Sequence, residues 1–89
     1  MTIQTLIGID VAKDELVVYR QDLETQETLE NRRPTLKQWV RGLPAHCAIA
    51  IEATGTYHVA LIELAYQCGH EIFVIDGYQL NHYRQGIGG

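Results

Sequence analysis

The hydrophobic and polar positions at the start of the chain predict three short strands. Residues 5–10 and 15–21 are largely apolar segments separated by a short charged turn, which favours an antiparallel hairpin. Residues 26–32 alternate weakly and are mostly polar, as expected of a strand at the edge of a sheet. Together the three segments predict an antiparallel meander.

A helix is expected after the meander. Pro34 breaks the strand pattern, and Thr35 followed by Gln38 matches the spacing of a capping box. Apolar residues then recur at the spacing of one helix face over residues 35–42, which places Trp39 against the sheet.

The rest of the chain alternates between strands and helices. The run 47–52 lacks polar alternation, which is typical of a strand covered on both faces, as in a parallel sheet. Residues 57–68 are apolar nearly all round and predict a helix, capped by Thr56, that is either deeply covered or buried in a partner. Two more elements are expected: a strand over residues 71–76 and a last helix over residues 79–84, ahead of the glycine-rich segment 86–89.

This order of elements predicts an α/β domain built on a mixed sheet. Right-handed strand–helix–strand connections put the helices on the faces of the sheet. The order is that of a ribonuclease H-like (RuvC-like) fold, with the first and fourth strands side by side in the centre. The 89 residues are enough for one small domain, residues 1–89.

Two carboxylates end apolar strands, Asp10 on the first and Glu52 on the fourth. Burying a carboxylate is costly unless it is paired, hydrogen-bonded or bound to metal. Because side chains alternate along a strand, each acid shares its face with small residues such as Gly8 and Ala50. On parallel neighbouring strands the acids would lie about 5 Å apart and repel each other unless a cation lies between them. The pair therefore predicts a site for Mg²⁺ or Mn²⁺.

Composition narrows the classes of protein that fit. The net charge of −4 argues against a self-sufficient nucleic-acid binder, which would carry a basic face. No apolar run approaches the roughly 20 residues that span a membrane, and residues 1–5 do not resemble a signal peptide. Without an export signal, Cys47 and Cys68 are expected to be reduced thiols in a cytoplasmic protein.

Three segments of the chain resemble one transposase family: IGIDVAKDEL, IEATGTYHVALIELAYQCGHEIFVID and NHYRQGIGG. The resemblance is to the N-terminal domain of the DEDD transposases of bacterial insertion sequences, the insertion-sequence-one-ten group, which also includes Piv-type DNA invertases. It covers essentially all 89 residues. The combination of GIDVAKD with E-A-T-G-x-Y at this separation is its most specific part.

The resemblance implies a RuvC-like domain whose four acids, Asp-Glu-Asp-Asp, bind divalent metal and act in cutting and rejoining DNA. By motif match the first acid is Asp10 and the second is Glu52. The last two are expected beyond the glycine-rich segment, so the domain is expected to stop before its last helix and to be inactive alone. The resemblance also implies DNA as substrate, a structured guide RNA as partner and a C-terminal domain with a nucleophilic serine; a homo-oligomer is expected too.

Four other residues are weaker candidates. Asp76 ends the fifth strand and is a conceivable stand-in for a further acid. Lys13, beside Asp10, and Thr54 and Arg84 are candidate contacts to nucleic acid. For these three, a hairpin tip, a turn and a terminal helix are the favoured structural explanations.

Two other functions fit parts of the pattern. ATPases of the actin and sugar-kinase superfamily also open with Gly-Ile-Asp before a hairpin. Their hairpins use small residues that let backbone amides approach phosphate, whereas Val-Ala-Lys-Asp-Glu here is bulky and acidic. A non-catalytic oligomerisation module is the second alternative. The apolar helix at 57–68 favours it, and it is compatible with a transposase domain.

Overall fold

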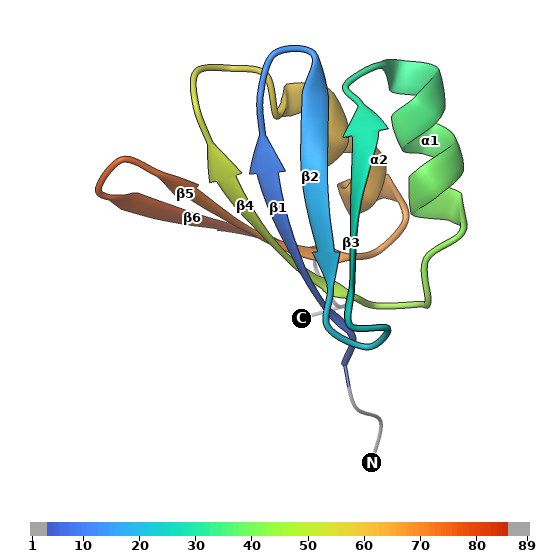
Figure 1. The fold of residues 1–89 in the computed structure, drawn as a ribbon. Helices are drawn as coiled ribbons and strands as arrows, with labels where there is room; N and C mark the ends of the chain where they lie inside the picture. The colour runs from blue at the N-terminus through green and yellow to red at the C-terminus, as the bar shows by residue number, and fades with distance from the viewer. Residues whose placement is uncertain (1–3, 86–89) are drawn as a thin grey trace.

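The computed structural model describes residues 4–85, which form a six-stranded sheet and two helices (Figure 1). The strands are β1 (Leu6–Val11), β2 (Glu15–Arg20), β3 (Thr25–Glu30), β4 (Ala48–Ala53), β5 (Glu71–Asp76) and β6 (Gln79–Tyr83), and the helices are α1 (Arg33–Arg41) and α2 (Val59–Gln67). The order across the sheet is β3-β2-β1-β4-β5-β6. As expected, β1 and β4 are parallel neighbours in its centre.

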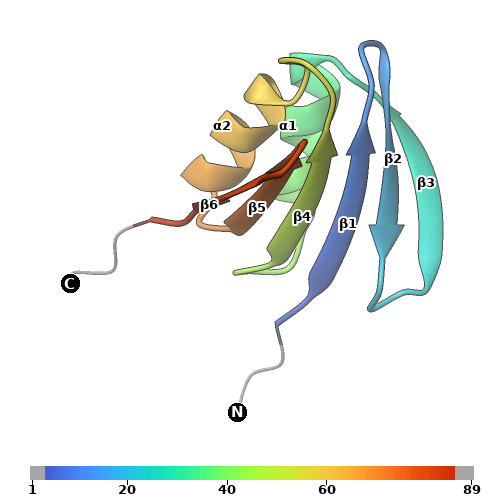
Figure 2. The ribbon, with the colours of Figure 1, turned by 90° about the vertical axis from the view of Figure 1, so that its left-hand side faces the viewer.

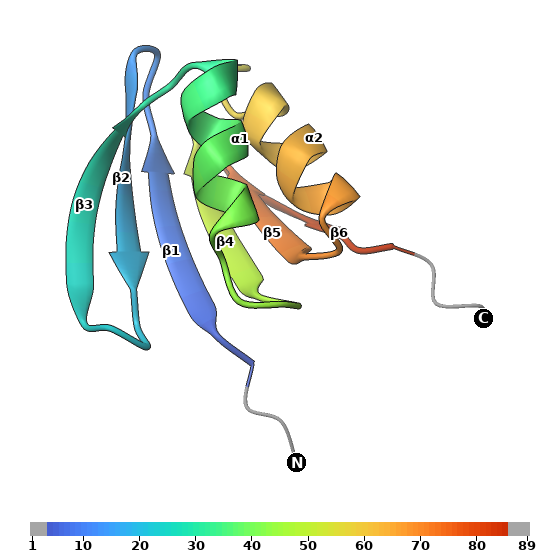
Figure 3. The same ribbon diagram turned by 90° about the vertical axis from the view of Figure 1, so that its right-hand side faces the viewer.

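Both helices pack on the same face of the sheet (Figures 2 and 3). On β1, Ile7, Ile9 and Val11 point into this layer and are buried, while the residues between them are not. α1 adds Leu36 and Val40 to the core. In the described part of the chain no helix covers the opposite face of the sheet, so the expectation that residues 47–52 form a strand covered on both faces is wrong: Ala50 and Glu52 are exposed. The result is a mixed α/β domain of two layers, compatible with a ribonuclease H-like arrangement.

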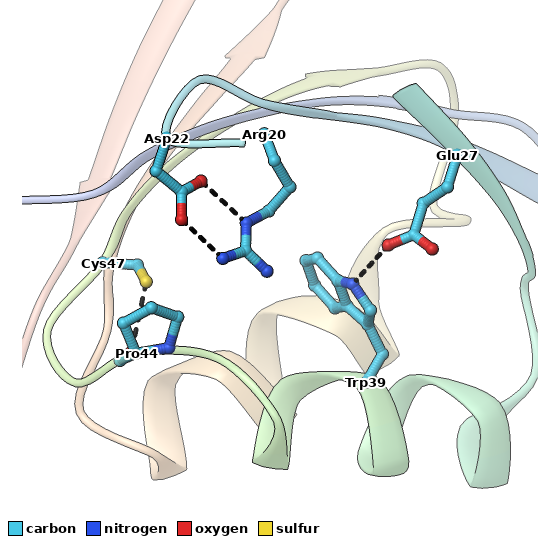
Figure 4. Close-up of polar contacts among 6 residues, drawn as sticks. All are labelled: Arg20, Asp22, Glu27, Trp39, Pro44 and Cys47. Carbon is cyan, nitrogen blue, oxygen red and sulfur yellow. Dashed lines mark hydrogen bonds and ion pairs between the residues drawn. The ribbon is translucent and has the colours of Figure 1, made fainter. Parts of the chain in front are cut away.

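α1 begins two residues earlier than predicted, at Arg33. Pro34 lies in its first turn. A backbone N–H at this position would have no hydrogen-bond partner within the helix, so proline is tolerated there. Arg32 is the N-cap and makes no side-chain capping bond, so the predicted capping box is not formed. Trp39 packs beside the core as expected, and its indole N–H donates to the Glu27 carboxylate of β3 at 3.1 Å (Figure 4).

α2 is shorter than predicted, because a turn occupies the residues before it. Its N-cap is His58 rather than Thr56, and no side chain caps it. One face is buried against the sheet and α1. The outer face is not, since Val59 is 48% exposed and Tyr66 38% exposed. Among the described residues no helix is long and apolar enough to cross a membrane.

The predicted helix over residues 79–84 is wrong. The chain forms β6 there, which pairs antiparallel with β5 across a two-residue turn at Gly77 and Tyr78. Gly77 has φ +60°, as expected of the first central residue of a type II′ hairpin turn. The chain therefore reverses at Gly77, and pairing with β5 outweighs the local helical preference.

Side chains also hold β6 to β5. The His82 ring stacks on Phe73 with the ring centroids 4.3 Å apart. The His82 Nε2 atom lies 2.7 Å from a carboxylate oxygen of Glu71. The glycine-rich segment 86–89, expected to follow, lies outside the described residues.

Polar contacts fix the end of the sheet where β2 finishes and β4 starts (Figure 4). Arg20 donates two hydrogen bonds to the Asp22 carboxylate, at 3.0 and 2.7 Å, and these bonds lower the pKa of Asp22. Cys47 is buried, and its thiol donates to the Pro44 carbonyl at 3.2 Å. Both Cys47 and Cys68 are free thiols, as expected.

Candidate functional site

Asp10 and Glu52 lie opposite each other on the two central strands. The parallel register of β1 and β4 pairs Asp10 directly with Glu52, and neighbouring strands are about 4.8 Å apart. Both side chains are exposed and lie on the face that the helices leave uncovered. This is the pairing that the alternation of the sequence predicts.

The residues around each acid explain why it is held in this position. Ile9 and Ile51 precede the acids, and Val11 and Ala53 follow them, and all four point into the core under the helices. Val11 pairs with Ala53, so both strands remain hydrogen-bonded for one residue beyond the acids. The two carboxylates are therefore carried by rigid strand, at the carboxyl ends of β1 and β4.

The uncovered face is hollow around the acids. A depression of about 320 Å³ is lined by both carboxylates together with Gly8, Tyr19 and Ala50. A methyl group added at Gly8 would meet no atom within 4 Å, so the space beside this glycine, which has no side chain, is open. A second depression of about 590 Å³ shares Gly8, Tyr19 and Ala50 and extends toward the start of the strands. The two depressions form one trough that ends at the acids.

Asp76 is not brought to this pair. Glu52 is paired with Ile75 of β5, so Ile75 lies on the uncovered face and Asp76, the next residue, on the other side. Within residues 4–85 no group of three or more His, Cys, Asp or Glu side chains has the geometry of a metal site.

The three candidate contacts to nucleic acid lie at two different ends of the sheet. Lys13 follows β1 and Thr54 follows β4. Both are exposed at the end of the sheet that carries the acids. Arg84 lies 3.9 Å from Glu71, the first residue of β5. Ile75 of β5 lies level with Glu52, and Glu71 precedes Ile75 by four residues. At about 3.3 Å per residue, Arg84 therefore lies roughly 13 Å from the acids along the strand direction.

The donor set suits a hard divalent cation. Mg²⁺ is commonly bound by one or two carboxylates, with water and substrate phosphate completing its octahedron, and Mn²⁺ prefers similar oxygen ligands. Between residues 4 and 85, neither Asp10 nor Glu52 has a hydrogen bond or ion pair through its side chain. Their four carboxylate oxygens thus face solvent and the trough.

The sequence interpretation overlooked Asn31. Its side-chain amide donates to the carbonyl oxygens of Ala12 and Tyr57, which lie in the loops after β1 and β4. The only signal in the sequence is an asparagine that directly follows a polar strand. Its partners could not be known before the loops were placed.

The fold and the paired acids define an α/β domain with an acidic site on an open sheet face. A family model described as transposase, the DEDD type of the IS110 group, matches residues 7–88, and the chain belongs to this family. The match includes both Asp10 and Glu52. Members are DNA-cutting enzymes that generally use divalent metals. A comparison with curated proteins found no match.

Proposed function

We propose that the chain is the RuvC-like, ribonuclease H-like catalytic domain of a transposase that cuts and rejoins DNA, with Asp10 and Glu52 as the residues that hold a divalent metal. The observation that carries this proposal is the register that sets Asp10 opposite Glu52 on an open face. Family membership supports the same function, and it gives no support to an ATPase or to a purely structural module.

The role of the chain in this reaction is to fix two carboxylates at one spacing. Rigid central strands hold them, and the trough leaves room for a nucleic-acid strand beside them. When bound, Mg²⁺ or Mn²⁺ would stabilise negative charge that develops on the phosphodiester. Lys13 and Thr54, which are exposed at the same end of the sheet as the acids, would contact a phosphate next to them, whereas Arg84 would meet nucleic acid only away from them.

The remaining members of the Asp-Glu-Asp-Asp set have no motif match in this chain. We propose that they come from another part of the transposase, along with the nucleophilic serine, and that residues 1–89 alone do not cleave DNA. A guide RNA, a homo-oligomer and a cytoplasmic location belong to the same proposal.

Isosteric substitution of the acids in the full transposase tests the proposal. Asp10→Asn and Glu52→Gln remove a charge with little change in shape, and each should lower Mg²⁺-dependent DNA cleavage about 100-fold or more. Asp76→Asn is the matched control, because Asp76 is an exposed strand-terminal acid on the other side of the sheet. Full cleavage by both Asp10→Asn and Glu52→Gln would refute the metal site. ATP turnover without nucleic acid would instead favour the actin and sugar-kinase type of ATPase.

A further inference from the structure

Asn31 connects the two loops that follow the acids. It lies directly after β3, and its Nδ2 atom donates to the Ala12 carbonyl at 2.8 Å and to the Tyr57 carbonyl at 2.9 Å. Ala12 comes two residues after Asp10, and Tyr57 comes five residues after Glu52. One amide group therefore bridges the chain segments that leave the two halves of the site.

The chemistry of the partners fixes the orientation of this amide. Both partners are carbonyl oxygens, so only the two N–H groups of the asparagine can face them. The backbone N–H of Asn31 also donates to the Asp14 carbonyl at 2.9 Å. A carboxylate of the same shape would lack both side-chain donors, and alanine would lack the group altogether.

Little else in the described chain joins these loops. The last pair of residues in the β1–β4 ladder is Val11 with Ala53. Beyond it, the Ala12 N–H bonds to Glu15 within its own hairpin, and apart from the bonds made by Asn31 the other backbone bonds that residues 4–85 show there are similarly local. Asn31 is the one residue in the described chain that hydrogen-bonds to both loops.

We infer that Asn31 is a positioning residue of the metal site. It contacts neither acid, and the β1–β4 register already fixes their spacing. Asn31 instead holds together the two loops that follow the acids, so that the ends of both strands stay in place beside the bound metal. This inference rests on the proposed function. Substitutions of residues that orient metal ligands typically weaken metal binding about 10–100-fold. We expect a loss of this size when Asn31 loses its donors.

The test uses the 89-residue chain, with Mn²⁺ alone as the probe. Paramagnetic broadening of the amide signals of Asp10 and Glu52 reports binding, and hydrogen exchange at Ala12 reports the loop. Asn31→Ala and Asn31→Asp should each weaken Mn²⁺ binding about 10–100-fold and speed exchange at Ala12. Cys47→Ala is the control, because Cys47 is buried at the opposite end of the sheet. It should lower the melting temperature and change neither readout.

The outcomes separate this inference from the proposed function. Unchanged exchange at Ala12 in Asn31→Ala would overturn the inference, whatever happens to the metal. Tighter Mn²⁺ binding by Asn31→Asp would overturn it as well, because charge rather than position would then control affinity. An unmodified chain whose Asp10 and Glu52 signals do not respond to Mn²⁺ would count against the metal site, while exchange would still decide whether Asn31 holds the loops.

Discussion

Lowering the pH should destabilise the fold through the buried side chain of His70, which is 2% exposed. Its Nδ1 atom accepts a hydrogen bond from the backbone N–H of Cys47 at 3.0 Å. Accepting at Nδ1 requires a neutral ring with its proton on Nε2. Burial and, to a smaller extent, the neighbouring His46 lower the pKa of His70 in the folded chain.

The size of the effect follows from proton linkage. In the unfolded chain His70 regains an ordinary pKa of about 6.5 and takes up a proton as the pH falls below that value. The folded chain stays neutral at this position, so the unfolded state binds more protons. The free energy of unfolding should then fall by up to about 1.4 kcal/mol per pH unit. The loss levels off below the lowered pKa of the folded state.

Urea denaturation between about pH 7.5 and about pH 5.5, followed by the fluorescence of Trp39, measures this loss. His70→Asn is the matched control, since its amide oxygen can accept the Cys47 N–H and does not titrate. All other titrating groups are common to both chains, so the difference between their pH profiles isolates His70. If both chains lose stability in parallel below about pH 6.5, the reasoning is refuted.

Three further predictions concern single positions. Gly8→Ala should stabilise the chain by roughly 0.5–1 kcal/mol in thermal unfolding, because the added methyl meets no atom within 4 Å; a lower melting temperature would contradict this. Gly77→Ala should weaken the β5–β6 hairpin by about 1–2 kcal/mol, because φ is +60° there, and should reduce NMR contacts between the strands; unchanged contacts would argue against the turn. A thiol reagent should modify exposed Cys68 well before Cys47, whose pKa burial raises, and equal rates in the folded chain would contradict the packing.

The central sheet and the acid pair could be predicted because their signals are local and repeat. Isoleucines alternate with small residues on both central strands, and this alternation alone puts Asp10 and Glu52 on one face. The limits of β5, Glu71–Asp76, also follow from its apolar run. That these residues hold metal remains a prediction.

The parts that could not be predicted depend on contacts between distant residues. Residues 79–84 fit a helix as well as a strand, and a positive φ at Gly77 with pairing to β5 decides between them. α1 begins earlier than predicted because its first turn accommodates Pro34. The role of Asn31 appears only once three separate segments meet.

The register of β1 against β4 has a consequence for how such a domain can evolve. Inserting one residue before Asp10 would turn its side chain toward the helices, and inserting two would move it about 6.6 Å past Glu52. Substitutions on the uncovered face away from the acids and the trough disturb no packed core and should be tolerated far more readily. We expect lineages of this domain to keep both acids and the lengths of the two central strands, while the remaining positions on that face vary in sequence.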